Sequence, residues 1–240
     1  KKQGMKFKML SKVTGAKANK TGVALTIEAV AGGKSETLKT DVVLVSVGRI
    51  PYTKDLGLEA LGVTMDKRGI VQVDHTYATN VPGIYAIGDC IPGPMLAHKA
   101  SEDGVACVEM MAGHHAEVDY NTVPGVVYTW PEAASVGATE QSLKADGVDY
   151  NVGKFPFTAN PRAKSNAFTE GFVKILAEKA TDRVLGVHIL GAEAGTLIHE
   201  AVLAMEFGGS AEDIARTTHA HPTLAEAMKE AALDVAGHVI

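Results

Sequence analysis

Residues 123–240 contain a run of strand-like segments followed by a run of helix-like segments, and this order constrains the fold more than any other feature of the chain. Consecutive strands followed by consecutive helices favour an α+β domain, in which helices pack against an antiparallel sheet. The adjacent Gly208 and Gly209 separate the first predicted helix from the second. The predicted strands span residues 125–129, 150–157, 172–178 and 184–190, and the predicted helices span residues 195–207, 211–216 and 224–236.

The first fifty residues have a different pattern. Residues 23–30 suit a strand, and residues 38–47 suit a second strand whose centre, residues 42–45, is continuously apolar. A continuous apolar run is typical of a strand that is buried on both faces of a sheet, as in α/β domains. The run ends at Gly48 and is soon followed by Pro51, so we expect the first domain boundary near residue 50.

The middle of the chain combines short strands with one long helix. The pattern predicts strands over residues 70–73 and 83–87 and a helix over residues 96–112, which Gly113 would end. The sequence therefore predicts three parts, which span residues 1–50, 51–120 and 121–240, and a fold that mixes α/β and α+β architecture.

The composition is that of an ordinary globular protein with a substantial core. Of 240 residues, 46% are hydrophobic and 21% are charged, and the formal net charge is -5. The mild acidity argues against nucleic acid as the main partner. No run of eighteen apolar residues occurs, so we expect no membrane span.

The start of the chain and its cysteines say little about compartment. Five lysines occur among the first twelve residues without an arginine, an apolar core or an initiating methionine, so a targeting peptide is not expected and the chain is expected to begin mid-protein. Cys90 and Cys107 are seventeen residues apart, which fits neither a Cys-x-x-Cys pair nor a disulfide framework. We interpret both as reduced, structural thiols.

The segment from His219 to Glu226 is the strongest candidate for chemistry. Imidazole is the side chain whose ordinary pKa lies nearest neutral pH, and a carboxylate beside one ring nitrogen fixes the tautomer and supports the protonated ring. His221, followed five residues later by Glu226 across a predicted helix start, offers such an acid-base pair.

Other interpretations of the same segment remain open. Thr223 and Glu226 fit a Thr-x-x-Glu capping box with Pro222 just before the first turn, so capping alone would explain Glu226. His221 could be an ordinary solvated or core histidine. His219 and His221 could also be metal ligands, but no second cluster at ligand spacing lies nearby, so we expect no metal.

The segment resembles the C-terminal signature of the dihydrolipoamide dehydrogenase family of flavin disulfide oxidoreductases. Residues 155–163 and 181–191 resemble stretches that are typical of the same family, and the resemblance covers essentially the whole chain. The family usually has Ser at Ala225 and His at Trp130, but neither difference removes a proposed catalytic group. The resemblance implies the tail of a NAD-binding domain over residues 1–50, a central FAD-contacting domain over 51–120 and an antiparallel-sheet-plus-helices dimerisation domain over 121–240.

The resemblance also implies the cofactor-binding residues. Gly88 and Asp89 close a short apolar strand, and in the family an aspartate at this place holds the ribityl chain of FAD. A turn with a capping aspartate is the plainer alternative. The resemblance further implies that the following helix start faces the flavin and that Gly48, with Arg49, lies beside the nicotinamide nucleotide, where a simple loop is the alternative. The helix-start residues concerned are Met95, Leu96, Ala97 and His98.

Three motifs of the family do not occur in this sequence. The chain has no two glycines two residues apart, so it contains neither of the two Gly-x-Gly-x-x-Gly turns, and it lacks the Cys-x4-Cys redox pair. It therefore resembles the C-terminal half of such an enzyme. The resemblance implies that such an enzyme oxidises protein-bound dihydrolipoamide and passes electrons through a redox disulfide and FAD to NAD⁺, with His221 as base and Glu226 as its partner.

The expected setting follows from the same resemblance. It implies a homodimer that associates with the lipoyl domains and core of 2-oxoacid dehydrogenase complexes, in the mitochondrial matrix or alternatively in a bacterial cytoplasm. A second hypothesis is a truncated, non-catalytic dimerisation or binding module, because the redox pair is absent from the sequence.

Overall fold

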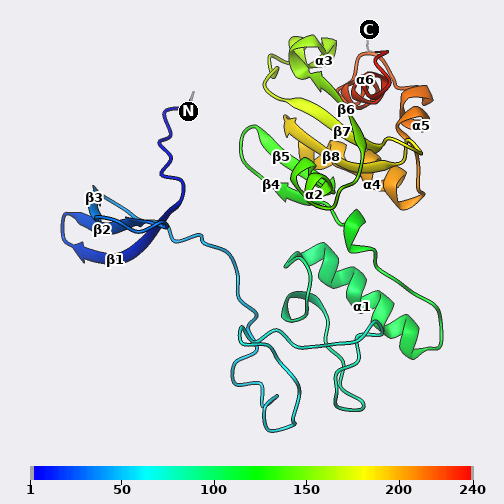
Figure 1. Ribbon diagram of the computed structural model, residues 1–240. Helices are drawn as coiled ribbons and strands as arrows, with labels where there is room; N and C mark the ends of the chain where they lie inside the picture. Colours follow the sequence, from blue (N-terminus) through cyan, green and yellow to red (C-terminus); the bar gives the residue numbers. More distant parts are fainter. Residues whose placement is uncertain (1–2, 239–240) are drawn as a thin grey trace. The chain divides into compact units, whose positions relative to one another are not determined.

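The computed structural model describes residues 3–238. They divide into two compact units, with the division between Arg49 and Ile50. Each unit is described by itself below (Figure 1).

The first unit is a three-stranded antiparallel sheet with the order β1-β2-β3. It consists of β1 (Ser11–Asn19), β2 (Gly22–Ala29) and β3 (Glu36–Thr40). The alternation of β2 buries Leu25 and Ile27, as expected of a strand with one covered face. β1 was not predicted from the sequence, because its residues are all exposed and have no apolar alternation.

The prediction of a buried strand over residues 38–47 is wrong beyond Thr40. Residues 42–47 follow β3 outside any strand, and Leu44 and Val47 are 87% and 93% exposed. An apolar strand is buried only when neighbouring strands pair with it and other elements cover the sheet. No strand of the described residues pairs with this segment.

The middle part of the chain is mostly loop around one helix, α1 (Ala97–Met111). This helix confirms the prediction over residues 96–112 to within one residue at each end. The strands predicted over residues 70–73 and 83–87 are wrong, since each is reduced to a single bridge, Met65 to Val71 and Ala78 to Tyr85. The apolar residues of this region pack into a small core with α1 instead of forming a ladder. That core comprises Val63, Val71, Tyr77, Ile91, Ala106 and Cys107.

The last part is the predicted α+β arrangement. Its five strands form an antiparallel sheet with the order β4-β5-β8-β7-β6. The strands are β4 (Gly125–Val127), β5 (Glu132–Gly137), β6 (Tyr150–Pro156), β7 (Phe172–Glu178) and β8 (Val184–Gly191). Three helices follow the strands in the chain: α4 (Ala194–Glu206), α5 (Ala211–Arg216) and α6 (Glu226–Val235).

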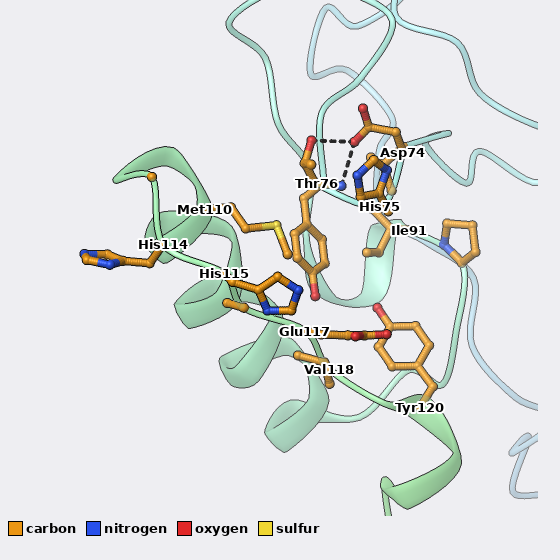
Figure 2. Close-up of a pocket in the computed structure, with 15 residues that line it drawn as sticks. Asp74, His75, Thr76, Ile91, Met110, His114, His115, Glu117, Val118 and Tyr120 are labelled. Atoms are coloured by element: carbon orange, nitrogen blue, oxygen red, sulfur yellow. Dashed lines mark hydrogen bonds between the residues drawn. The ribbon is translucent and has the colours of Figure 1, made fainter.

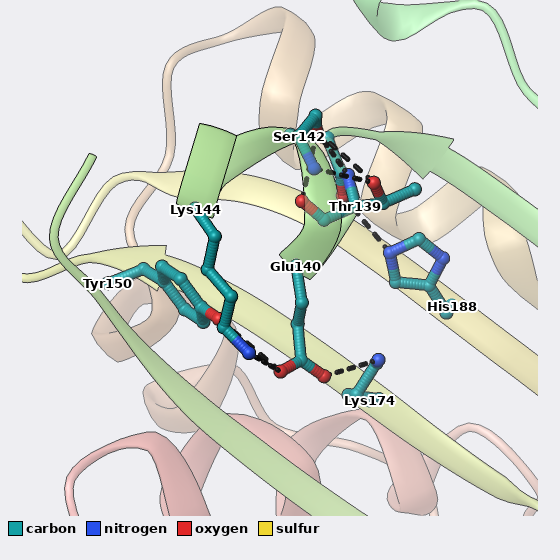
Figure 3. Close-up of polar contacts among 8 residues, drawn as sticks. Thr139, Glu140, Ser142, Lys144, Tyr150, Lys174 and His188 are labelled. Carbon is teal, nitrogen blue, oxygen red and sulfur yellow. Dashed lines mark hydrogen bonds and ion pairs between the residues drawn. The ribbon is translucent and has the colours of Figure 1, made fainter. Parts of the chain in front are cut away.

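Both α4 and α6 pack against the sheet, with α4 along β5 and β8 and α6 along β6 and β7 (Figure 1). They enclose the main core, to which β7 contributes Val173 and Ile175, each fully buried. Between these two residues, Lys174 points to the other face of the sheet, where α2 (Glu140–Ala145) lies (Figure 3).

One strand and two α-helices among the described residues of this part were not predicted: β5, α2 and α3 (Pro161–Ser165). β5 is only six residues long, and α2 and α3 have six and five. Such short segments carry too few positions for a periodic pattern. Their ends are instead set by local caps, such as the Thr139 and Ser142 capping box of α2. The six-residue α5 was predicted because Gly208 and Gly209 separate it from the preceding helix.

A polar contact joins the middle part to the last part, because His98 Nε2 lies 2.8 Å from the carbonyl oxygen of Pro124. Within the last part, the Thr122 hydroxyl donates to Glu206 at 2.7 Å. Within the described residues no helix is long and apolar enough to cross a membrane.

The two cysteines are not joined to each other. Cys107 is buried and Cys90 half-buried, and neither is in a disulfide.

Candidate acid-base pair and cofactor-facing turn

His221 lies in the loop that joins α5 to α6. Its Nδ1 is 2.7 Å from Oε1 of Glu226, the first residue of α6. The His221 side chain is 67% exposed, whereas that of Glu226 is 19% exposed. No group of the described residues is hydrogen-bonded to Nε2, so the unbonded nitrogen of an anchored ring faces outward. This is the geometry of a general base that acts on a group outside the chain.

Glu226 makes both contacts that the sequence suggested for it, one with the His221 ring and one with the helix start. While Oε1 binds His221, Oε2 accepts the backbone N–H of Thr223 at 2.7 Å. That second bond is the glutamate half of a capping box. The threonine half is absent, because the Thr223 hydroxyl donates to the carbonyl of Ala220 at 2.7 Å. Glu226 therefore both closes the helix start and orients the imidazole.

The carboxyl of Glu226 is held in its charged form. Burial by itself would raise its pKa, but the Thr223 N–H, the bond and charge of His221 and the charge of His219 outweigh burial and lower the pKa below its ordinary value of 4.5. An ionised carboxylate at this place keeps Nδ1 of His221 protonated. Nε2 then has the lone pair that a base needs.

His219 belongs to a second histidine-carboxylate pair. Its Nε2 lies 2.7 Å from Oε1 of Glu200 on α4, and its Nδ1 lies 3.0 Å from the carbonyl oxygen of Thr217. The His219 side chain is only 7% exposed. Both ring nitrogens of His219 are thus engaged, and His221 uses one of its own on Glu226. The two rings do not converge on a shared ligand position.

Two further residues hold the loop, and sequence reasoning did not identify them. Lys229 of α6 donates to the carbonyls of Ala215 and Thr217 at 2.6 and 2.9 Å. Asn160, fully buried, donates from Nδ2 to the carbonyl of Thr223 at 3.0 Å. Asn160 lies within the 155–163 stretch, which was the only signal that could have pointed to it.

Asp89 lies in a short 3-10 turn, Gly88–Cys90, ahead of α1. Its side chain is exposed, and no group of the described residues hydrogen-bonds its carboxylate. Gly88 has a φ of +71°, and a Cβ on it would come within 2.9 Å of the Ala100 side chain, so the turn requires glycine. An exposed carboxylate without a partner on a constrained turn fits a ligand that offers hydroxyl groups.

The start of α1 is the second cofactor-facing feature. Its N-cap residue, Leu96, makes no side-chain cap, and the first turn has no acidic residue. The first backbone N–H groups of the helix, including that of Ala97, are therefore available to an electron-rich group, which the helix dipole also favours. Met95 and Leu96 are half-buried beside them. The His98 ring is turned to Pro124, so only its backbone N–H belongs to this set.

Gly48 belongs to the first unit. Its φ of +112° lies in the left-handed region, and no heavy atom lies within 4 Å of where a Cβ would stand. The backbone here can adopt a turn that other residues disfavour, which suits close approach of a ligand.

A pocket of about 690 Å³ opens beside α1, but none of the catalytic or cofactor-binding residues predicted from the sequence lines it. Figure 2 shows the His115 and Tyr120 rings and the Met110 side chain of α1 among the groups that line it. Tyr77 and Tyr120, which also line the pocket, reach the buried carboxylate of Asp103.

Comparisons with known proteins agree across the whole chain. The sequence profile described as "Pyridine nucleotide-disulphide oxidoreductase" matches residues 1–104, and the profile of its "dimerisation domain" matches residues 123–232. The chain is 61% identical over 232 residues to "Dihydrolipoyl dehydrogenase 2, mitochondrial" of Arabidopsis thaliana and 58% identical over 233 residues to "Dihydrolipoyl dehydrogenase, mitochondrial" of Homo sapiens. Each alignment covers 97% of this chain and 46% of the relative. The chain thus spans about half the length of these relatives.

A solved structure supports the fold. The crystal structure of LpdA from Mycobacterium tuberculosis superimposes with a TM-score of 0.83 at 28% sequence identity. The match covers 94% of this chain and 48% of that one.

Proposed function

Because the chain belongs to the pyridine nucleotide-disulphide oxidoreductase family, we propose that it supplies the acid-base pair and the dimer interface of a dihydrolipoamide dehydrogenase. The observation that carries the proposal is the 2.7 Å contact between His221 and Glu226, with the other ring nitrogen exposed. The relatives' names supply the substrate class, dihydrolipoyl groups.

In this role His221 Nε2 takes the proton of a substrate thiol. The thiolate, and not the thiol, attacks a disulfide sulfur, so removing this proton is the necessary first step. Glu226 stabilises the resulting imidazolium, because its carboxylate lies directly on Nδ1. Overall, the two thiols of dihydrolipoamide become a disulfide, NAD⁺ takes up a hydride, and one proton is released.

The cofactors of this activity are FAD and NAD, and the chain offers groups that fit them. FAD, when bound, supplies electron transfer between a protein disulfide and the nicotinamide. The Asp89 carboxylate would accept hydrogen bonds from the ribityl hydroxyls. The free N–H groups of Ala97 and His98 at the start of α1 would face the flavin ring, with Met95 and Leu96 beside it. Gly48 would lie beside the NAD.

The partners follow from the exposed histidine and the matched dimerisation domain. An imidazole that is 67% exposed serves substrate best when a second chain completes the site around it. We therefore assign His221 to the active site shared with the other subunit of a homodimer. Lipoyl domains of 2-oxoacid dehydrogenase complexes would bring the substrate. The mitochondrial names of the relatives support the mitochondrial matrix as the compartment of this enzyme.

Substitution of His221 by Gln in the flavin-containing enzyme tests the acid-base role. Turnover is expected to fall by about 10²- to 10⁴-fold, the range for losing a general acid or base. His199→Gln is the matched control, since His199 is exposed on α4 and its ring has only a 3.4 Å contact with the Thr196 carbonyl. Steady-state kinetics with dihydrolipoamide measure both. Activity of His221→Gln within threefold of wild type would refute the role.

A non-catalytic dimerisation module is the second candidate, because the two cysteines of the chain, Cys90 and Cys107, cannot form the redox pair of the family. Intact mass and a visible spectrum of the purified protein separate the two. A polypeptide near twice 25.1 kDa with flavin absorption supports the enzyme. A colourless polypeptide of 25.1 kDa supports the module.

A further inference from the structure

Two oppositely charged side chains are completely buried in α1. Lys99 and Asp103, one helical turn apart, are both 0% exposed, and Nζ of Lys99 is 2.8 Å from Oδ2 of Asp103. Removing two charges from water is costly, and the attraction between them repays the cost only when further hydrogen bonds satisfy both groups. A buried pair is thus weak evidence for stability and invites another explanation.

The pair encloses the backbone of one residue. Lys99 Nζ donates to the carbonyl of Gly88 at 3.0 Å, and Asp103 Oδ2 accepts the Gly88 N–H at 3.0 Å. The N–H and the C=O of Gly88 are therefore both bonded to charged side chains. Such charge-assisted hydrogen bonds are stronger than those between neutral groups. Gly88 is the residue immediately before Asp89. We name this arrangement of Lys99, Asp103 and Gly88 the clasp.

Two tyrosines complete the hydrogen bonding of the clasp. Asp103 Oδ1 accepts from the hydroxyl of Tyr120 at 2.9 Å and from that of Tyr77 at 3.3 Å, and the Tyr120 ring lies 4.9 Å from Lys99 Nζ. Figure 2 shows Tyr120 on the wall of the pocket. Burial and the charge of Asp103 raise the pKa of Tyr77 to about 12, so the hydroxyl stays a donor. Both oxygens of the Asp103 carboxylate are thus hydrogen-bonded.

We propose that Lys99 and Asp103 are positioning residues for the flavin, because they tie the Asp89 turn to the first turn of α1. This inference rests on the proposed cofactor role of Asp89 and of the start of that helix. Lys99 itself belongs to the first turn of α1, so one ion pair sets the distance between the two cofactor-facing features. The clasp prepares that geometry before the cofactor binds, which lowers the cost of binding.

The decisive variant is Lys99→Met with Asp103→Leu in the complete flavoprotein. Apolar replacement of both partners leaves no unpaired charge, so the fold can persist without the clasp. Figure 3 shows an ion pair of the same length in the last part, in which Lys174 Nζ of β7 lies 2.8 Å from Oε1 of Glu140 of α2, with both side chains partly exposed. Lys174→Met with Glu140→Leu is therefore the control. FAD binding to each apo-protein is measured by fluorescence titration, and folding by thermal unfolding.

The clasp variant is expected to bind FAD about tenfold or more weakly, as for the loss of hydrogen bonds to charged groups, and the control to bind within about twofold of wild type. A folded clasp variant with unchanged FAD affinity overturns the inference. Equal weakening in both double variants also overturns it, because the effect would then follow from general destabilisation.

Milder variants decide the matter if the clasp variant does not fold. Tyr120→Phe removes one hydrogen bond to Asp103, and Tyr150→Phe is its control, since Tyr150 donates to Glu140 at 3.3 Å. Weaker FAD binding by about threefold or more in Tyr120→Phe alone supports the clasp, and unchanged binding overturns it. Asp89→Ala distinguishes a failure of the proposed cofactor role from a failure of the clasp. If it does not weaken FAD binding, the proposed cofactor role fails; if only the clasp variants have no effect, the inference alone fails.

Discussion

Glu226 uses its two carboxylate oxygens for two different tasks. One oxygen orients the His221 ring, and the other closes the backbone of Thr223 at the start of α6. A single carboxylate thereby couples the geometry of the base to the helix that carries it. The neighbouring pair of His219 and Glu200 differs, because the His219 ring is buried and both of its nitrogens are bonded.

The pH dependence of stability tests the charge of Glu226. Its folded-state pKa lies below the ordinary value of 4.5, so the stabilisation is present above pH 4.5 and is lost as the pH falls through the folded-state pKa. We expect the difference in unfolding free energy between wild type and Glu226→Gln to shrink as the pH falls below about 4. Chemical denaturation between about pH 5 and pH 3 measures it. A difference that grows across this acid range would contradict the assignment.

At the scale of elements, the loop between α5 and α6 is held by groups that come from elsewhere. Glu200 of α4 binds His219, Lys229 of α6 binds the carbonyls at the end of α5, and Asn160 binds the carbonyl of Thr223. The short segment that carries His221 is therefore bound to three separate elements. Preorganisation of this kind allows an exposed side chain to keep one direction.

Glu200→Gln removes the charge that links α4 to this loop. We expect a loss of about 1–2 kcal/mol of unfolding free energy, because His219 is buried while Glu200 is partly exposed to solvent. Glu212→Gln is the control, since its pair with Arg216 is exposed on both sides and should contribute about 0.5 kcal/mol or less. Urea denaturation at neutral pH compares the two. Equal losses would show that the buried histidine adds nothing.

At the scale of the whole molecule, large apolar side chains remain exposed on the last part of the chain. Leu203 and Phe207, at the C-terminal end of α4, are 61% and 82% exposed, and Tyr128, just after β4, is 81% exposed. α4 packs against β4, so these side chains come from neighbouring elements. Exposed apolar side chains on neighbouring elements mark an association surface, and the family match assigns dimerisation to this part.

Leu203→Glu tests whether this surface lies in the dimer interface. A buried unpaired carboxylate is costly, so we expect the dimer dissociation constant to rise about tenfold or more. Val13→Glu, in the exposed strand β1 of the other unit, is the control and should leave the dimer unchanged. Analytical ultracentrifugation over a concentration series measures both variants. An unchanged dissociation constant for Leu203→Glu would place the interface elsewhere.

The sequence by itself determined the features that are encoded by neighbouring residues. The helix at Ala97–Met111 follows from its own apolar pattern, and the strand at Phe172–Glu178 begins and ends where the sequence predicted. The pairing of His221 with Glu226 could be predicted because only five residues separate them, within reach of one helix start.

Only the tertiary structure decided the contacts between residues that are distant in the chain. Glu200 binds His219, and Lys99 and Asp103 bind Gly88, but no local sequence pattern predicts these contacts. The apolar run at residues 42–45 predicted a buried strand over residues 38–47, yet Val42, Leu44 and Val45 are exposed. Hydrophobicity favours burial but cannot provide the neighbouring strands. Local propensity depends on adjacent side chains, whereas pairing and burial depend on the path of the whole chain.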